Sequence, residues 1–153
     1  MRPEIFNAFI VAAGEVLVSE ANLQIRCGPL TLKHDAYVTN DVSVLISLVG
    51  KVSGLAIISL SFDTAKALTS RILGQEITDF NELAQSGIGE LGNVVVGLAS
   101  AKMEALGYRT EISVPTLIVG KGSHISTLGI QRLIVPLETQ LGMIRLDLAL
   151  REG

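Results

Sequence analysis

The chain has 153 residues, which is room for one domain with a sizeable hydrophobic core, and we expect residues 1–153 to form a single domain. Its net charge of -3 and its lack of any lysine or arginine run argue against nucleic acid as a partner. No apolar run approaches the roughly 18 residues of a membrane helix, and no secretory signal pattern is present. With Cys27 as the single cysteine, no internal disulfide is possible, which fits the cytoplasm.

The first predicted element is a helix over residues 3–19. Pro3 stands near its start, and apolar residues follow at helical spacing. The same helix contains Glu4 and Asn7, three residues apart. We do not interpret this pair as a site, because a carboxylate in a first turn simply complements the helix dipole.

An irregular connection and a β-hairpin are predicted next. Residues 21–40 hold polar breaks and one short alternation, which indicate a connection with a single short strand. Residues 42–49 and 55–60 are rich in Val, Leu and Ile and flank a Gly-Lys turn, as in a hairpin. A second helix follows, with Ser61 or Asp63 as its cap.

A long helix is predicted over residues 79–107. Asp79 and Glu82 have the spacing of a capping box, and Gly107 follows the last apolar residue of the pattern. Projected at about 100° per residue, one set of apolar side chains gathers on a single face, which we expect to be buried. This set is Ala84, Ile88, Leu91, Val94, Val95, Leu98, Ala99 and Leu106.

The other side of this helix carries a polar stripe, formed by Glu82, Ser86, Glu90, Asn93, Ser100 and Glu104. Glu90 and Asn93 point the same way about one turn apart. The helix also contains four glycines, each costing roughly 0.5–1 kcal/mol relative to alanine. They indicate close packing on a sheet or helix, or, at Gly89 and Gly97, space for a partner to reach Glu90 and Asn93.

Three strands complete the pattern, at residues 111–119, 126–135 and 142–150, with a break at Pro136. A helix followed by a hairpin thus occurs twice, which suggests a duplicated unit. We expect an α+β fold, with an antiparallel sheet of about six strands and the helices packed on one face. An unprotected edge strand would favour a homodimer formed through sheet edges.

The sequence lacks the residues needed for a phosphate-binding loop or a metal site. The Gly-Lys pairs at 50–51 and 120–121 have neither the upstream glycine nor the following residue of a phosphate-binding loop, so we interpret them as hairpin turns. His34 and His124 have no second histidine or cysteine at ligand spacing. A metal site built by this chain is therefore not expected.

The pattern Ser86-x-x-x-Glu90-x-x-Asn93, with Pro115 some twenty residues later, resembles the motif of the CheC/CheX/FliY chemotaxis phosphatases. That motif has Asp or Ser, then Glu, then Asn, then a distant Pro. The residues around it are similar too, as in Ile112-Ser-Val-Pro-Thr116, and the order of helices, turns and strands matches throughout. Because the first helix offers no second intact motif, the resemblance is to the single-site CheX branch.

This resemblance implies a phosphatase whose substrate is the aspartyl-phosphate of a CheY-like response regulator. Asn93 would orient the attacking water, Glu90 would pair with the regulator's lysine, and Ser86 would bond a carbonyl one turn back or touch the regulator. Pro115 would have a structural role, shaping the start or edge of its strand beside the helix. The regulator would supply Mg²⁺, so no cofactor is expected in this chain. The alternative is a non-catalytic interaction module of a chemotaxis or flagellar switch assembly.

Overall fold

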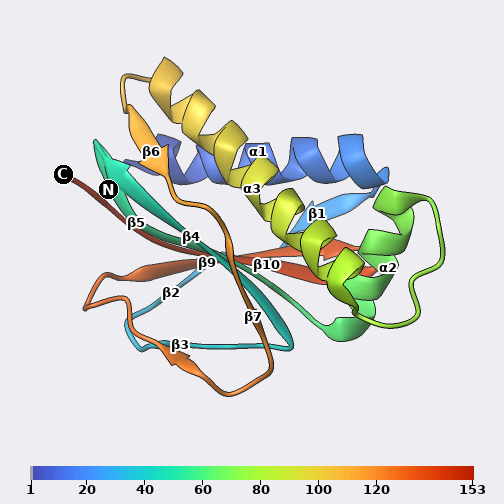
Figure 1. The fold of residues 1–153 in the computed structure, drawn as a ribbon. Coiled ribbons are helices and arrows are strands. Elements are labelled where there is room, and N and C mark those ends of the chain that lie inside the picture. Colours follow the sequence, from blue (N-terminus) through green and yellow to red (C-terminus); the bar gives the residue numbers. More distant parts are fainter. Residues whose placement is uncertain (1) are drawn as a thin grey trace.

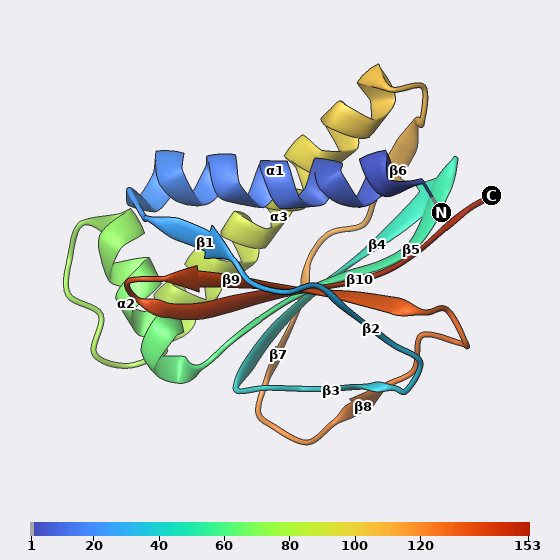
Figure 2. The ribbon, with the colours of Figure 1, turned by 180° about the vertical axis from the view of Figure 1, so that it is seen from behind.

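Residues 2–153 are described by a computed structural model. Within them, three helices cover one face of a twisted antiparallel sheet (Figures 1 and 2). The helices are α1 (Pro3–Ala21), α2 (Phe62–Leu73) and α3 (Glu82–Ala105). The strands are β1 (Ile25–Cys27), β2 (Thr31–Lys33), β3 (Tyr37–Val38), β4 (Val42–Gly50), β5 (Val52–Leu60), β6 (Thr110–Ile112), β7 (Thr116–Val119), β8 (His124–Ile125), β9 (Arg132–Thr139) and β10 (Gly142–Glu152).

The main sheet runs in the order β1-β9-β10-β5-β4-β6, and its neighbouring strands are antiparallel. β2 also pairs with β9, and β7 also pairs with β4, which makes a sheet of eight strands among the described residues. β3 and β8 pair as a separate ribbon. The predicted hairpin turn at residues 120–121 was therefore wrong, because β7 before it pairs with β4 and β8 after it pairs with β3. The predicted α+β architecture is confirmed. The sheet exceeds the predicted count because each edge consists of two short strands in succession, and residues 21–40 hold three short strands, not one.

One edge of the sheet breaks at Pro115. Between β6 and β7 the register against β4 shifts by one residue, which marks a β-bulge. Ser113 bridges this break, because its backbone N donates to the Ser47 carbonyl at 3.0 Å and its Oγ accepts from the Ser47 backbone N at 2.9 Å. The prediction of one continuous strand over 111–119 was wrong, since proline has no N–H to donate to a ladder.

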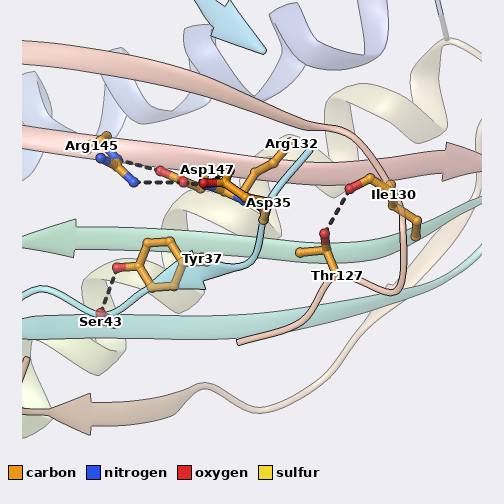
Figure 3. Close-up of polar contacts among 8 residues, drawn as sticks. All are labelled: Asp35, Tyr37, Ser43, Thr127, Ile130, Arg132, Arg145 and Asp147. Carbon is orange, nitrogen blue, oxygen red and sulfur yellow. Dashed lines mark hydrogen bonds and ion pairs between the residues drawn. The ribbon is translucent and has the colours of Figure 1, made fainter. Parts of the chain in front are cut away.

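The predicted break at Pro136 was also wrong, because β9 passes through this residue. The Pro136 carbonyl accepts from the Gly28 backbone N at 2.8 Å. The N and O of a strand residue point to the same side, so the missing N–H of Pro136 faces the gap between β1 and β2. No ladder hydrogen bond is lost there. Residues 126–131 instead form a turn, in which the Thr127 hydroxyl donates to the Ile130 carbonyl at 2.8 Å (Figure 3).

The core lies between the helices and one face of the sheet. Alternate residues of the long strands point into it, because successive side chains of a strand face opposite sides. In β4 these residues are Val42, Val44, Ile46 and Leu48, and in β10 they are Ile144, Leu146, Leu148 and Leu150. The predicted buried face of α3 is partly wrong. Val94 is 37% exposed, while Gly92, Val96 and Met103 are buried, because the helix turns a slightly different face to β4 and α1. Leu106 is 50% exposed because the helix ends at Ala105, one residue before it.

Gly92 allows α3 to approach the sheet closely. A Cβ at this position would lie 2.8 Å from Val44 Cγ1, closer than real side chains pack. Gly89 is different, because a Cβ there would have no atom within 4 Å, and Gly97 would meet only Ile112 Cδ1 at 4.0 Å. Close packing therefore accounts for Gly92, and Gly89 and Gly97 border open space.

We expect Gly92→Ala to lower the free energy of unfolding by about 1–3 kcal/mol, because the stiff, buried Val44 side chain cannot move aside. The matched variant Gly89→Ala is expected to raise it by about 0.5–1 kcal/mol, since only the helix preference changes. Urea unfolding followed by circular dichroism measures both. A stabilised Gly92→Ala variant would contradict the close contact.

The second face of the sheet carries a buried ionic cluster under the β3–β8 ribbon (Figure 3). The Asp147 carboxylate is fully buried and accepts from Arg132 Nε at 2.6 Å and from Arg145 Nε at 2.7 Å. The Tyr37 ring lies 5.8 Å from both guanidinium carbons, and its hydroxyl is 2.8 Å from Ser43 Oγ. The cluster thus joins β9 and β10 to the ribbon that covers them.

Arg145 remains charged within this cluster. Burial lowers the pKa of its guanidinium, but the hydrogen bonds and charge of Asp147, with a smaller effect of Tyr37, outweigh burial and raise the pKa above its ordinary value. An arginine in this setting does not lose its proton at physiological pH. The Asp147 carboxylate is therefore the counter-charge of both guanidinium groups.

We expect Asp147→Ala to lower the free energy of unfolding by about 3–5 kcal/mol, because Arg132 would be left buried without its counter-charge. The control is Asp35→Ala, which removes a side chain that is 73% exposed and 3.8 Å from Arg132. That change should cost less than about 1 kcal/mol. Chemical denaturation measures the free energy of unfolding of both variants. Equal losses would contradict the prediction that the buried Asp147 stabilises the fold more than the exposed Asp35 does.

Candidate functional site

The polar stripe is presented by α3, a helix of 24 residues and about 36 Å. Asn81 caps its N-terminus, accepting from the Ala84 backbone N at 3.0 Å through its side-chain oxygen. The predicted cap at Asp79 was wrong, because the chain becomes helical only after Asn81, and asparagine is an equally good cap. The predicted glycine stop is confirmed: Gly107 has a φ of 94°, and the Tyr108 backbone N donates to the Met103 carbonyl at 2.8 Å.

Ser86, Glu90 and Asn93 all lie on the solvent side of α3. Ser86 and Glu90 are exposed, and Asn93 is half-buried. Neighbours at this spacing on a helix have Cβ atoms about 5–6 Å apart, so the carboxylate and the carboxamide can contact one visiting surface together. The structure therefore places the three residues side by side in a position that a partner can reach.

These three side chains take no part in the hydrogen bonds and ion pairs formed within residues 2–153. Of the two roles expected for Ser86, the bond to a carbonyl one turn back is not made, whereas Ser70 of α2 makes such a bond at 2.7 Å. Further along the stripe, Ser100 donates to the Thr110 carbonyl at 3.2 Å and so serves the fold. The donors and acceptors of Glu90 and Asn93 thus remain available to a ligand.

Exposed apolar side chains lie on the same helix and on the connection beside it. Leu83 is 48% exposed and Val94 is 37% exposed, both on α3. Val114, which is 81% exposed, lies in the connection from β6 to β7, and this connection runs beside α3 (Figure 1). A mixed patch of this kind, with polar groups among exposed apolar ones, is typical of a protein–protein contact surface.

A hollow of about 340 Å³ lies beside Glu90. It is lined by Glu20 of α1, Ile72 and Leu73 of α2, and Gly87, Glu90, Leu91 and Val94 of α3. The sequence did not predict this hollow. Its residues come from three helices, of which α1 is separated from α2 by five strands, and no local pattern reports how such helices meet.

The Glu4–Asn7 pair of α1 is placed differently. The Glu4 carboxylate accepts from the Tyr108 hydroxyl at 3.3 Å and lies 3.8 Å from Arg2 Nη1. Glu4 Oε1 is thus engaged by the fold, whereas the Glu90 carboxylate makes no such contact within residues 2–153.

Two further features are absent from the described part of the chain. No three His, Cys, Asp or Glu side chains within residues 2–153 are grouped so that they could hold a metal ion. The helices of the same residues are too short or too polar to cross a membrane.

Comparison with known proteins decides the family. The family model described as "Chemotaxis phosphatase CheX" matches residues 42–138, which include the whole polar stripe and Pro115. The chain belongs to the CheX family of chemotaxis phosphatases. The predicted family resemblance is thereby confirmed.

Other CheX-family and related proteins match over nearly the whole chain. The CheY-P phosphatase CheX of Thermotoga maritima is 32% identical over 132 residues, which are 85% of this chain and 84% of that protein. A CheC-like superfamily protein from Shewanella sp. PV-4 superposes with a TM-score of 0.89 at 26% identity, covering 99% of each chain. A chain of the CheX–CheY–BeF₃–Mg²⁺ complex from Borrelia burgdorferi gives a TM-score of 0.85 at 30% identity, covering 99% of this chain and 100% of that one.

Proposed function

We propose that this CheX-family protein hydrolyses the aspartyl-phosphate of a CheY-type response regulator, acting as a single domain over residues 1–153. The observation that carries this proposal is the presentation of Glu90 and Asn93, one turn apart, exposed or half-exposed and unbonded within the described chain. The Thermotoga maritima relative is a CheY-P phosphatase, and the Borrelia burgdorferi complex contains CheY with Mg²⁺, which supports the same class of substrate.

Asn93 positions the attacking water. Its carboxamide offers both a donor and an acceptor, so it can hold a water molecule in line with the phosphorus. The water oxygen bonds to phosphorus as the bond to the aspartate oxygen breaks, which yields a free aspartate carboxylate and inorganic phosphate, with the water protons passing to phosphate and solvent. The gain comes from orientation, which is large when nucleophile and electrophile are already prepared.

Glu90 docks the regulator. Its carboxylate pairs with the lysine of the regulator's phosphorylation site, a charge-assisted contact that also sets the register of docking. Ser86, one turn before Glu90 on the same face, contacts the regulator's surface. Gly89 and Gly97 leave room for that surface, as their open surroundings indicate. Pro115 keeps the β6–β7 connection at its bulge beside α3 and has a structural role.

The metal belongs to the partner in this scheme. Mg²⁺ bound by the regulator neutralises charge on the phosphoryl group, and the regulator's lysine supplies a further positive charge. This chain contributes only an amide and an acid. A regulator of this class works in the cytoplasm, where a lone cysteine also stays reduced.

Asn93→Ala is expected to reduce the accelerated dephosphorylation by roughly 100-fold or more, because the water loses its orientation, while the regulator still binds. Glu90→Ala should weaken binding by roughly 10- to 100-fold, the value of a charge-assisted hydrogen bond. Phosphorylated CheY-type regulators of the same organism are the substrates. Release of phosphate measures the rate, and titration with the regulator carrying BeF₃⁻, a stable stand-in for phosphoryl, measures the affinity.

Glu104→Gln, an exposed change far along the same helix, serves as the control and should leave both quantities unchanged. If wild type accelerates no regulator, catalysis is excluded, and the chain is an interaction module of a chemotaxis or flagellar switch assembly. Equal affinities of the Asn93→Ala and Glu90→Ala proteins would contradict the docking role of Glu90.

We also propose a homodimer through the sheet edge formed by β1 and β2. Leu30 and Leu32 are 49% and 55% exposed at this edge, and a groove of about 610 Å³ lies between them and Phe6 and Ile10 of α1. In the strand order, this edge and β6 lie at opposite ends of the sheet. It is β6, and not this edge, that lies next to α3. A second copy bound here leaves the regulator's docking surface open.

Leu32→Lys is expected to convert a dimer into a monomer, because it places a charge in the apolar contact. Val119→Lys changes a similarly exposed residue at the other edge, 46% against 55% for Leu32, and should leave the dimer intact. Sedimentation velocity measures the mass of each protein. A monomeric wild type, or a Val119→Lys variant that alone dissociates, would reject this edge.

A further inference from the structure

The hollow beside Glu90 is held in place by a contact between two helix ends. Arg71 Nη1 donates to the backbone carbonyls of Ala21 and Asn22, each at 3.0 Å, so the C-terminal turn of α2 is tied to that of α1. Figures 1 and 2 show the two ends next to each other. α3 comes close to α2 at Gly87, where a Cβ would lie 3.4 Å from Thr69 Cγ2. The hollow is therefore a fixed feature of the three-helix layer.

Its walls and its rim differ in chemistry. Ile72, Leu73, Leu91 and Val94 provide apolar walls. The rim carries the carboxylates of Glu20 and Glu90, and neither is among the groups that form ion pairs within residues 2–153. Two helices end at the hollow, and the carbonyls of a helix C-terminus carry partial negative charge. The guanidinium of the nearby Arg71 donates its hydrogen bonds to the carbonyls at the end of α1.

This combination selects one kind of occupant. Glu90 pairs with the regulator's active-site lysine in the proposed docking, so a purely aliphatic side chain would cover the walls but leave the Glu20 carboxylate without a partner. An anion would be repelled. Lysine and arginine have an apolar stem and a cationic end, so one such side chain can pack on the apolar walls and also pair with a carboxylate at the rim. The hollow shares Glu90 with the proposed catalytic pair and is thus continuous with the surface on which a regulator docks.

We propose that the hollow binds a lysine or arginine of the response regulator that is separate from the lysine of its phosphorylation site. The methylene groups of this residue pack on Ile72, Leu73 and Leu91, and its charged end pairs with Glu20. This inference rests on the proposed function, since the regulator reaches the hollow only by docking on α3. Two contacts, at Glu90 and at Glu20, then fix the rotation of the regulator about Asn93. A regulator without the second basic residue is bound less well, so the hollow confers specificity.

The test is reversal of the charge at Glu20. Glu20→Lys should raise the Kd for the BeF₃⁻- and Mg²⁺-loaded regulator, and the KM for its phosphorylated form, by about tenfold or more. The kcat at saturating regulator should not change, because Asn93 is untouched. Glu20→Gln should show a smaller rise in both. A cation near the end of α1 complements the helix dipole, so the variant should fold, and its circular dichroism spectrum and thermal unfolding verify this.

Glu104→Lys is the matched control. It makes the same charge change on an exposed residue of α3 about 21 Å from Glu90 along the helix axis, and its Kd should stay within about twofold of wild type. Equal effects of Glu20→Lys and Glu104→Lys would mean that only net charge matters and would overturn the proposal. An unchanged Kd for Glu20→Lys would do the same.

The occupant is identified from the regulator's side. Each of its exposed lysines and arginines is replaced by alanine and combined with Glu20→Gln in a double-mutant cycle. One basic residue other than the active-site lysine should couple to Glu20, and coupling to none would reject the proposed occupant. Failure of the catalytic proposal is recognised separately, because it requires that Asn93→Ala match wild type in rate, whereas this inference is tested by binding.

Discussion

The close contact between Gly92 of α3 and Val44 of β4 is the constraint on which the presented side chains depend. A residue with a Cβ at position 92 would push the helix away from the sheet. Because one side of α3 is held so tightly, its rotation is set, and Glu90 and Asn93 face outward with little freedom to turn inward. A residue that orients water needs such a rigid support, since small displacements cost much of the rate.

Strand pairing repeats between the two halves of the chain. β1 and β2 pair with β9, while β6 and β7 pair with β4, and the halves meet at β5–β10 and β3–β8. Each half thus supplies the edge of the other, so neither can complete its sheet alone. The symmetry does not extend to the chemistry, because Glu4 of α1 is engaged by Tyr108 and Glu90 of α3 is not. The predicted duplication of a helix–hairpin unit stays a prediction.

The proposed division of chemistry between two proteins follows from what the surface of α3 offers. It presents a carboxamide, a carboxylate and an adjoining acidic hollow, which are groups for positioning and recognition. The phosphoryl group, its metal and its lysine would come from the regulator. Binding energy from contacts at Glu90 and at the hollow can then be used to place Asn93 against the phosphorus, so that recognition and catalysis depend on one docking geometry.

The sequence by itself determined the long helices, the hairpin over residues 42–60, the polar stripe with Glu90 and Asn93, and the family motif, because helical period, strand alternation and caps act between near neighbours. Only the tertiary structure decided how strands from opposite halves pair, why Pro136 lies within a strand, and which glycine of α3 packs closely on the sheet. It also brought Glu20 to Glu90, since Arg71 ties α2 to α1 beside α3. These outcomes depend on contacts between residues far apart in the chain, and a local pattern contains no information about such contacts.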